Sequence, residues 1–61
     1  MGTEPAHVFE DWMYPGQWRV EWFDGDRGSE LAIFSRPNAR ERATRYADRQ
    51  YGHFEEVDSK P

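Results

Sequence analysis

The chain of 61 residues contains no cysteine, so no disulfide can stabilise it, and the absence fits a reducing compartment. No stretch approaches the ~20 consecutive apolar residues that a membrane-spanning helix needs. The N-terminus also lacks the basic segment and apolar run of a secretory signal peptide. The sequence therefore predicts a cytoplasmic protein without a membrane partner.

The short length limits the protein to one small domain, which buries only about 60% of its unfolded surface. Without disulfides, such a domain gains stability from a metal, from oligomerisation or from an unusually rich core. Three Trp, three Tyr and four Phe make up 16% of the chain, and each large ring can bury about 150–250 Å². We expect these rings to build the core, with oligomerisation as the second source of stability.

Lysine is scarce and positive charge is unevenly placed: arginine supplies seven of the eight basic residues, and the net charge is −4. Acidic residues dominate positions 1–30, and arginines dominate positions 31–54. The overall acidity argues against bulk affinity for nucleic acid, which comes from neutralising phosphates. A local positive face remains compatible with it.

Two segments alternate apolar and polar residues with the period of a β-strand. They are Gln17–Asp24 and Ser29–Ser35, joined by the polar loop Gly25–Gly28, whose four residues are a common hairpin length. Pro15-Gly16 is a turn signal that separates this hairpin from what precedes it.

The hydrophobic pattern selects the hairpin register, because a slip by one residue would put the tryptophans opposite the wrong face. A four-residue loop predicts that Trp22 faces Leu31 and that Val20 faces Ile33. The opposite face then carries an apolar strip, Phe23, Ala32 and Phe34.

Alanine recurs at every fourth position, 39, 43 and 47, among arginines. This spacing predicts a helix with a small face that approaches the sheet closely. Either Ser35 caps it, with Pro37 in the first turn, or Asn38 and Glu41 form a capping box. The helix should end near Tyr51, with Gly52 as a left-handed stop.

The predicted fold is α+β: a small β-hairpin followed by one α-helix in the C-terminal half. Residues 53–57 are a candidate third strand. Residues 1–16 form an N-terminal arm, whose aromatic segment Val8–Tyr14 is either helical or extended, residues 17–57 the ββα(β) domain, and residues 58–61 a disordered tail. The predicted core is apolar and comes from both strands and the helix: Trp18, Val20, Trp22, Leu31, Ile33, Ala43, Tyr46 and Ala47.

Candidate catalytic and metal-ligating residues are few. His7 and His53 lack the ligand set of a structural zinc site, and the segment Asp24–Glu30 lacks the acidic spacing of an EF-hand and suits a polar turn. No serine lies in a nucleophile motif. The sequence therefore predicts a protein that is not an enzyme and that has no catalytic residue, cofactor or metal.

The arginine face of the helix is the ambiguous feature: Arg40, Arg42, Arg45 and Arg49. Guanidinium groups bind phosphates and carboxylates in a bidentate manner, so the face suits nucleic acid or an acidic partner. The alternative, which we favour, is a solvated face whose charges pair with the chain's own acids.

The apolar strip that includes Phe23 and Phe34 is the second candidate partner surface. Large apolar patches on small proteins usually mark interfaces. Either the Phe9/Trp12/Met13 segment folds back over it, or a second chain covers it in a homodimer.

The segments W-x-V-E-W-F-D-G-D (Trp18–Asp26) and A-I-F-S-x-P-x-A-R-E-R-A-x-x-Y-A (Ala32–Ala47) resemble a family of small uncharacterised proteobacterial proteins. That family has no assigned activity, so the resemblance implies fold and a bacterial origin rather than function. The chain is also similar, more weakly, to the arm-site-binding N-terminal domains of tyrosine integrases. Those domains read DNA with a basic sheet, whereas Glu21 and Glu30 lie in the strands here.

No motif specifies a reaction or a ligand. The function that the sequence favours is a small non-enzymatic protein-interaction or accessory module, with a homodimer or an unknown protein as partner. The alternative is a nucleic-acid-binding accessory protein that uses the arginine-rich helix.

Overall fold

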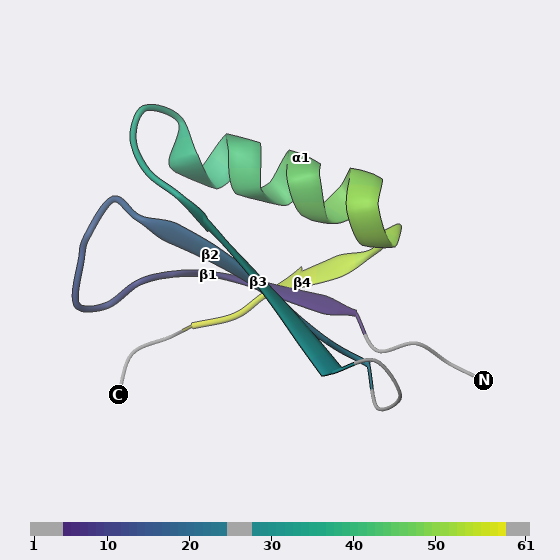
Figure 1. Cartoon of the computed structure of the whole chain (residues 1–61). Helices are drawn as coiled ribbons and strands as arrows, with labels where there is room; N and C mark the ends of the chain where they lie inside the picture. The colour runs from purple at the N-terminus through teal and green to yellow at the C-terminus, as the bar shows by residue number, and fades with distance from the viewer. Residues whose placement is uncertain (1–4, 25–27, 59–61) are drawn as a thin grey trace.

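One helix lies across one face of a four-stranded mixed sheet in the computed structural model, which describes residues 5–24 and 28–58. The strands are β1 (Ala6–Glu10), β2 (Trp18–Asp24), β3 (Gly28–Phe34) and β4 (Phe54–Glu56), and the helix is α1 (Ala39–Tyr51). The strand order across the sheet is β3-β2-β1-β4 (Figure 1). The α+β class predicted from the sequence is confirmed, and the sheet is larger than the predicted hairpin.

The N-terminal segment supplies a central strand. β1 runs antiparallel to β2, with Val8 opposite Val20, and parallel to β4, with Ala6 opposite Phe54. Part of the predicted arm, residues 6–10, thus belongs to the same sheet as the hairpin. The aromatic segment is extended through Glu10 and then bends. The candidate third strand at residues 53–57 is confirmed as β4. Of the predicted tail, only Asp58 lies within the described residues.

The β2–β3 register differs from the predicted one by one residue. Trp22 lies opposite Glu30 and Val20 opposite Ala32. The cause is the loop length: Asp24 pairs with Gly28, so three residues rather than four connect the strands, and these three lie outside the described residues. A one-residue shift turns a whole strand over, and the predicted facing of β3 is therefore wrong.

The two sides of β3 are exchanged by this shift. Ala32 and Phe34 pack against the helix-side core, whereas Leu31 and Ile33 are each 51% exposed. The prediction that Leu31 and Ile33 belong to the core is wrong. The predicted strip of Phe23, Ala32 and Phe34 does not form, because Phe23 lies on the opposite side of the sheet from the other two.

Neither predicted N-terminal cap forms at α1. Asn38 occupies the cap position with φ of 55° but its side chain makes no capping hydrogen bond, and Ser35 lies outside the helix. Instead, Arg42 Nη1 donates to the carbonyl oxygens of Ser35 at 2.7 Å and Pro37 at 3.1 Å. The predicted end is confirmed: Gly52 has φ of 86° and its N–H donates to the Asp48 carbonyl oxygen.

The core is made of small side chains. Two helix alanines, Ala43 and Ala47, cluster with residues of β1 and β2. The buried apolar residues are Ala6, Val8, Val20, Ala39, Ala43 and Ala47. Half-buried rings surround them: Trp18, Trp22, Phe34, Tyr46, Tyr51 and Phe54. The helix alanines thus allow a close approach to the sheet, and the rings seal the margin rather than fill the centre.

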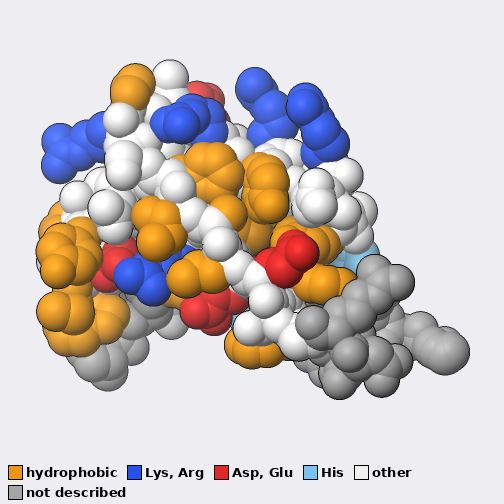
Figure 2. Space-filling model, in the orientation of Figure 1, with side chains coloured by type: hydrophobic (Ala, Val, Ile, Leu, Met, Phe, Trp, Pro, Cys, Tyr) orange, Lys and Arg blue, Asp and Glu red, His pale blue; other side chains and the backbone are white. Residues whose placement is uncertain are grey.

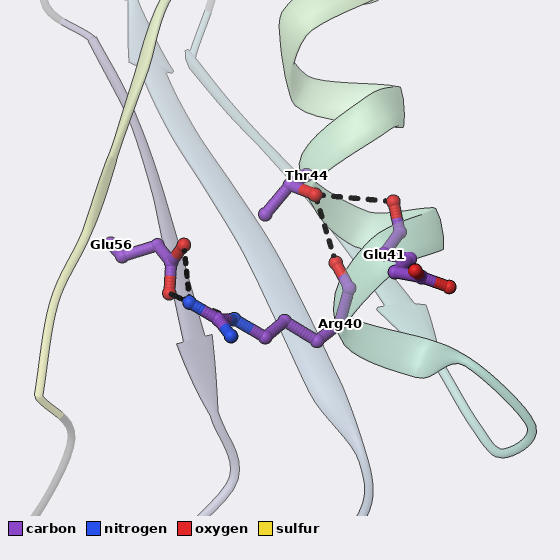
Figure 3. Close-up of polar contacts among 4 residues, drawn as sticks. All are labelled: Arg40, Glu41, Thr44 and Glu56. Atoms are coloured by element: carbon purple, nitrogen blue, oxygen red, sulfur yellow. Dashed lines mark hydrogen bonds and ion pairs between the residues drawn. The ribbon is translucent and has the colours of Figure 1, made fainter.

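A polar contact joins the helix to the edge strand β4. The guanidinium group of Arg40 donates to both carboxylate oxygens of Glu56, with Nη2 2.9 Å from Oε1 and 3.0 Å from Oε2 (Figure 3). Thr44 Oγ1 donates back to the helix carbonyls of Arg40 and Glu41. Both ion-pair partners are solvent-accessible, so the pair orients β4 more than it stabilises the fold.

Within residues 5–24 and 28–58, no helix is long and apolar enough to cross a membrane.

A matched pair of substitutions tests the register. Val20→Ala removes buried methyl groups and should lower the free energy of unfolding by about 2 kcal/mol. Leu31→Ala changes a half-exposed side chain and should cost about 0.5 kcal/mol. Urea unfolding followed by tryptophan fluorescence at low micromolar protein measures both. A larger decrease in the free energy of unfolding for Leu31→Ala than for Val20→Ala would contradict the observed register and support the predicted four-residue loop.

Candidate functional site

The side of the sheet opposite α1 carries large apolar side chains that no helix or strand of the described residues covers. We call this side the open face. Phe23, Leu31 and Ile33 project from it and are 57%, 51% and 51% exposed. The strand pairing sets Ile33, Arg19 and Phe9 in one row across it. The face is therefore a mixed surface, with apolar groups at both ends of a row and a guanidinium between them.

Asp11 organises the connection that leads from β1 to β2 beside this face. Its Oδ1 accepts a hydrogen bond from the Met13 backbone N–H at 2.9 Å, and its Oδ2 accepts one from Arg19 Nε at 2.9 Å. Its own backbone N–H donates to the Gln17 carbonyl oxygen. Asp11 is only 7% exposed, so these bonds replace the water it loses on burial.

The same connection presents three large side chains to solvent, which we call the aromatic loop. Trp12, Met13 and Tyr14 are 58%, 60% and 57% exposed. A hollow of about 210 Å³ lies between this loop and the open face; its lining is Phe9, Asp11, Trp12, Met13, Tyr14, Arg19 and Glu21. The loop and the open face therefore border one another and form a continuous surface.

The four candidate arginines do not share one role. Arg40 is engaged by Glu56 and Arg42 by two backbone carbonyls. Arg45 and Arg49 make no hydrogen bond or ion pair with any residue in the described part of the chain. Phe34 lies half-buried against Tyr46, with ring centroids 5.4 Å apart, whereas Phe23 is on the open face.

Three of these arginines gather where α1 overhangs the edge strand β3. Arg42, Arg45 and Arg49, here called the Arg stripe, line a hollow of about 250 Å³ together with Phe34 and Tyr46. The Arg42 guanidinium lies 5.7 Å from the centre of the Phe34 ring, within cation–π range. Figure 2 shows basic side chains above a band of hydrophobic side chains. The stripe thus combines positive charge with aromatic surface.

Tyr51 closes the other end of this edge. Its ring stacks on Trp22 at 4.9 Å, and its hydroxyl donates to Glu30 Oε1 at 2.6 Å. Burial of the phenol, followed by the hydrogen bond to Glu30, raises the pKa of Tyr51 well above its ordinary value. The phenol therefore stays protonated and holds the only carboxylate of β3.

The two histidines lie apart in the structure. His7 is half-buried in β1, opposite Glu21 and Glu55 in the neighbouring strands, and His53 is exposed before β4. Among the residues that the structure describes, no three histidine, aspartate or glutamate side chains come together as metal ligands would. The Asp24–Glu30 segment spans residues outside the described part.

No protein-family model matches the chain, and no curated protein or solved structure matches it. The resemblances noted in the sequence therefore stay predictions.

Sequence reasoning identified the arginines and Phe23 but missed the open-face pair Leu31 and Ile33 and the anchoring role of Asp11. The missed signal for the pair is that both alternations of β3 are apolar, Leu31/Ile33 and Ala32/Phe34. For Asp11, an acidic residue placed directly before a run of bulky side chains favours a side-chain-capped turn.

The Tyr51 hydrogen bond predicts an alkaline loss of stability. Because the pKa of Tyr51 is raised in the folded chain, its contribution is fully present below the unfolded pKa of about 10 and decreases as the pH rises above it. Urea unfolding at neutral and alkaline pH should show a smaller decrease for Tyr51→Phe than for the parent chain. Equal decreases in the two chains would contradict this role.

Proposed function

We propose that the protein is a small non-enzymatic interaction module that binds through the open face and the aromatic loop, and that its first partner is a second copy of itself. The observation that carries the proposal is the exposed apolar side chains of Phe23, Leu31 and Ile33 on the open face, which the aromatic loop borders beside Phe9 and Arg19. Extended apolar patches of this kind are typical of protein–protein interfaces.

The small core supports the same conclusion. The only fully buried side chains larger than alanine are Val8 and Val20 within the described residues, while six larger apolar residues remain more than half exposed. A domain of this length has a small free energy of unfolding. Covering the open face would bury the half-exposed side chains of Phe23, Leu31 and Ile33.

A two-fold arrangement fits a face that carries both signs of charge. An isologous interface brings the same patch of each subunit together, so Arg19 of one copy can approach Glu21 of the other. Sheets that pack face to face leave their edges free. The hydrogen bonds of Asp11 hold the aromatic loop in place, which reduces the entropy lost on association.

A charged residue on the open face should dissociate the dimer. Ile33→Glu places a carboxylate in the proposed interface, whereas the control Gln50→Glu adds the same charge to the exposed side of α1. Sedimentation equilibrium at ~0.5 mM protein, above micromolar association constants, should give a dimer for the parent and the control and a monomer for Ile33→Glu. A parent monomer at that concentration would overturn self-association.

Nucleic acid is the second candidate partner, favoured by Arg45 and Arg49, which have no carboxylate partner among the described residues. Phosphate contacts would give steeply salt-dependent binding, yet Arg40 and Arg42 are already engaged, and the open face carries Glu21. We therefore expect no shift of duplex or single-stranded DNA by high-micromolar protein at low salt. A salt-sensitive shift that Arg45→Gln/Arg49→Gln abolishes would favour nucleic acid instead.

A further inference from the structure

The two edges of the sheet are unequal. The β4 edge has three residues, two of them glutamates, and Arg40 binds one of these. The β3 edge has seven residues and a single charge, Glu30. Short length and charge are the features that protect an edge from pairing with another strand. β3 is long and carries only this one charge, and alternate residues of such an edge direct their N–H and C=O groups outward.

Positive charge borders this edge on the helix side. The Arg stripe lies over the Phe34 end of β3, where it lines the 250 Å³ hollow with Phe34 and Tyr46. Arg45 and Arg49 have no polar partner in the described residues, so their guanidinium groups are available to a ligand. The one carboxylate of β3, on Glu30, is already bound by the Tyr51 hydroxyl at the opposite end.

Apolar surface borders the same edge on the other side, where Leu31 and Ile33 are half exposed. A strand that adds to β3 places successive side chains on opposite faces of the sheet. One set would lie beneath the Arg stripe and the other beside Leu31 and Ile33. The edge is therefore complementary to a segment in which acidic and apolar residues alternate.

We propose that β3 captures an extended acidic–apolar peptide segment of another protein as a fifth strand, with the peptide carboxylates bound by Arg45 and Arg49. Main-chain hydrogen bonds to β3 supply affinity in this mode, and side-chain contacts on the two faces supply sequence preference. The bidentate fork of arginine suits carboxylates at such a site. This site goes beyond self-association: the two share Leu31 and Ile33, whereas the main-chain edge of β3 and the Arg stripe belong to the peptide site alone.

A second copy of the chain is the poorer occupant of this edge. Antiparallel pairing of β3 with itself is related by a two-fold axis perpendicular to the sheet, which puts both helices on the same side. The Phe34 end of each strand would then lie beside the Gly28 end of the other, where the one carboxylate, that of Glu30, is already held by Tyr51, so the second copy offers no free carboxylate to either Arg stripe. Nucleic acid would satisfy the arginines but could neither extend the β3 hydrogen-bond ladder in the same way nor bury Leu31 and Ile33.

The test is an NMR titration of the ¹⁵N-labelled chain with an end-blocked peptide of the length of β3 that alternates glutamate and valine. We expect shift changes along residues 28–34 and at the Arg stripe, with affinity that falls as salt rises. The same peptide N-methylated at alternate residues should lose at least about tenfold in affinity, because it cannot complete a ladder. A lysine–valine peptide should not bind.

Two double variants that change the net charge equally distinguish a specific contribution of the Arg stripe to peptide affinity from a general effect of charge. Arg45→Gln/Arg49→Gln should weaken binding at least about tenfold, and Arg36→Gln/Arg40→Gln less than about twofold. Arg36 is a suitable control because its side chain reaches Gly16, away from the stripe, and Arg40 faces Glu56.

Several results would overturn the proposal. Equal affinity of the N-methylated peptide, with shifts confined to α1, would mean a charge contact without strand addition. An equal loss of peptide affinity in both double variants would mean a non-specific electrostatic effect. No chemical-shift change with the glutamate–valine peptide would mean that the β3 edge does not bind such a strand. A dimer of the parent chain that persists in this last case would leave the proposed function intact.

Discussion

The close contact between two helix alanines and the middle of the sheet is the constraint on which the rest of the structure depends. Ala43 and Ala47 are fully buried, as are Ala6 and Val8 of β1. Because these side chains are small, α1 lies near the sheet and the bulky rings are displaced to the margin. Trp18, Trp22 and Tyr46 therefore become half-buried. The chain has many aromatic residues, but they do not form the centre of its core.

Displacement of the rings has a consequence for function. The rings of Phe34 and Tyr46 pack against each other between α1 and β3. Together with the Arg stripe they line one hollow. On the other side of the sheet, no second helix is present in the described residues to cover Phe23, Leu31 and Ile33. A single helix thus leaves the molecule with two different exposed surfaces, one apolar and one cationic–aromatic.

The sequence predicts much of the fold because its periodic signals are local. Alternation identifies β2 and β3, the alanine spacing identifies α1, and Gly52 marks its end. β1 is harder to identify because one of its two neighbours in the sheet is distant in the chain: β4 pairs with it in parallel across the whole hairpin and helix. Its own pattern, AHVFE, contains only two strongly apolar large residues, Val8 and Phe9.

The β3 register could not be predicted because the two faces of this strand are almost equally apolar. Leu31 and Ile33 suit a core by size, and Ala32 and Phe34 suit it by the space that remains under Tyr46. The choice between them depends on a connection one residue shorter than predicted and on the packing of Phe34 on Tyr46, which is a tertiary contact. The same ambiguity gives β3 its exposed leucine and isoleucine, so the failed prediction and the candidate interface have one cause.

The arginines illustrate how position along a helix divides identical residues between structure and binding. Arg40 points toward β4 and meets Glu56, and Arg42 lies one turn from the helix start, where free carbonyls of the preceding segment accept its hydrogen bonds. Arg45 and Arg49 lie farther along, over a strand whose one carboxylate is held by Tyr51. Sequence reasoning treated all four as one face, either neutralised by the chain's own acids or free to bind. Of the four, only Arg40 pairs with one of the chain's own acids; Arg42 is engaged by backbone carbonyls, and Arg45 and Arg49 make no hydrogen bond or ion pair within the described residues.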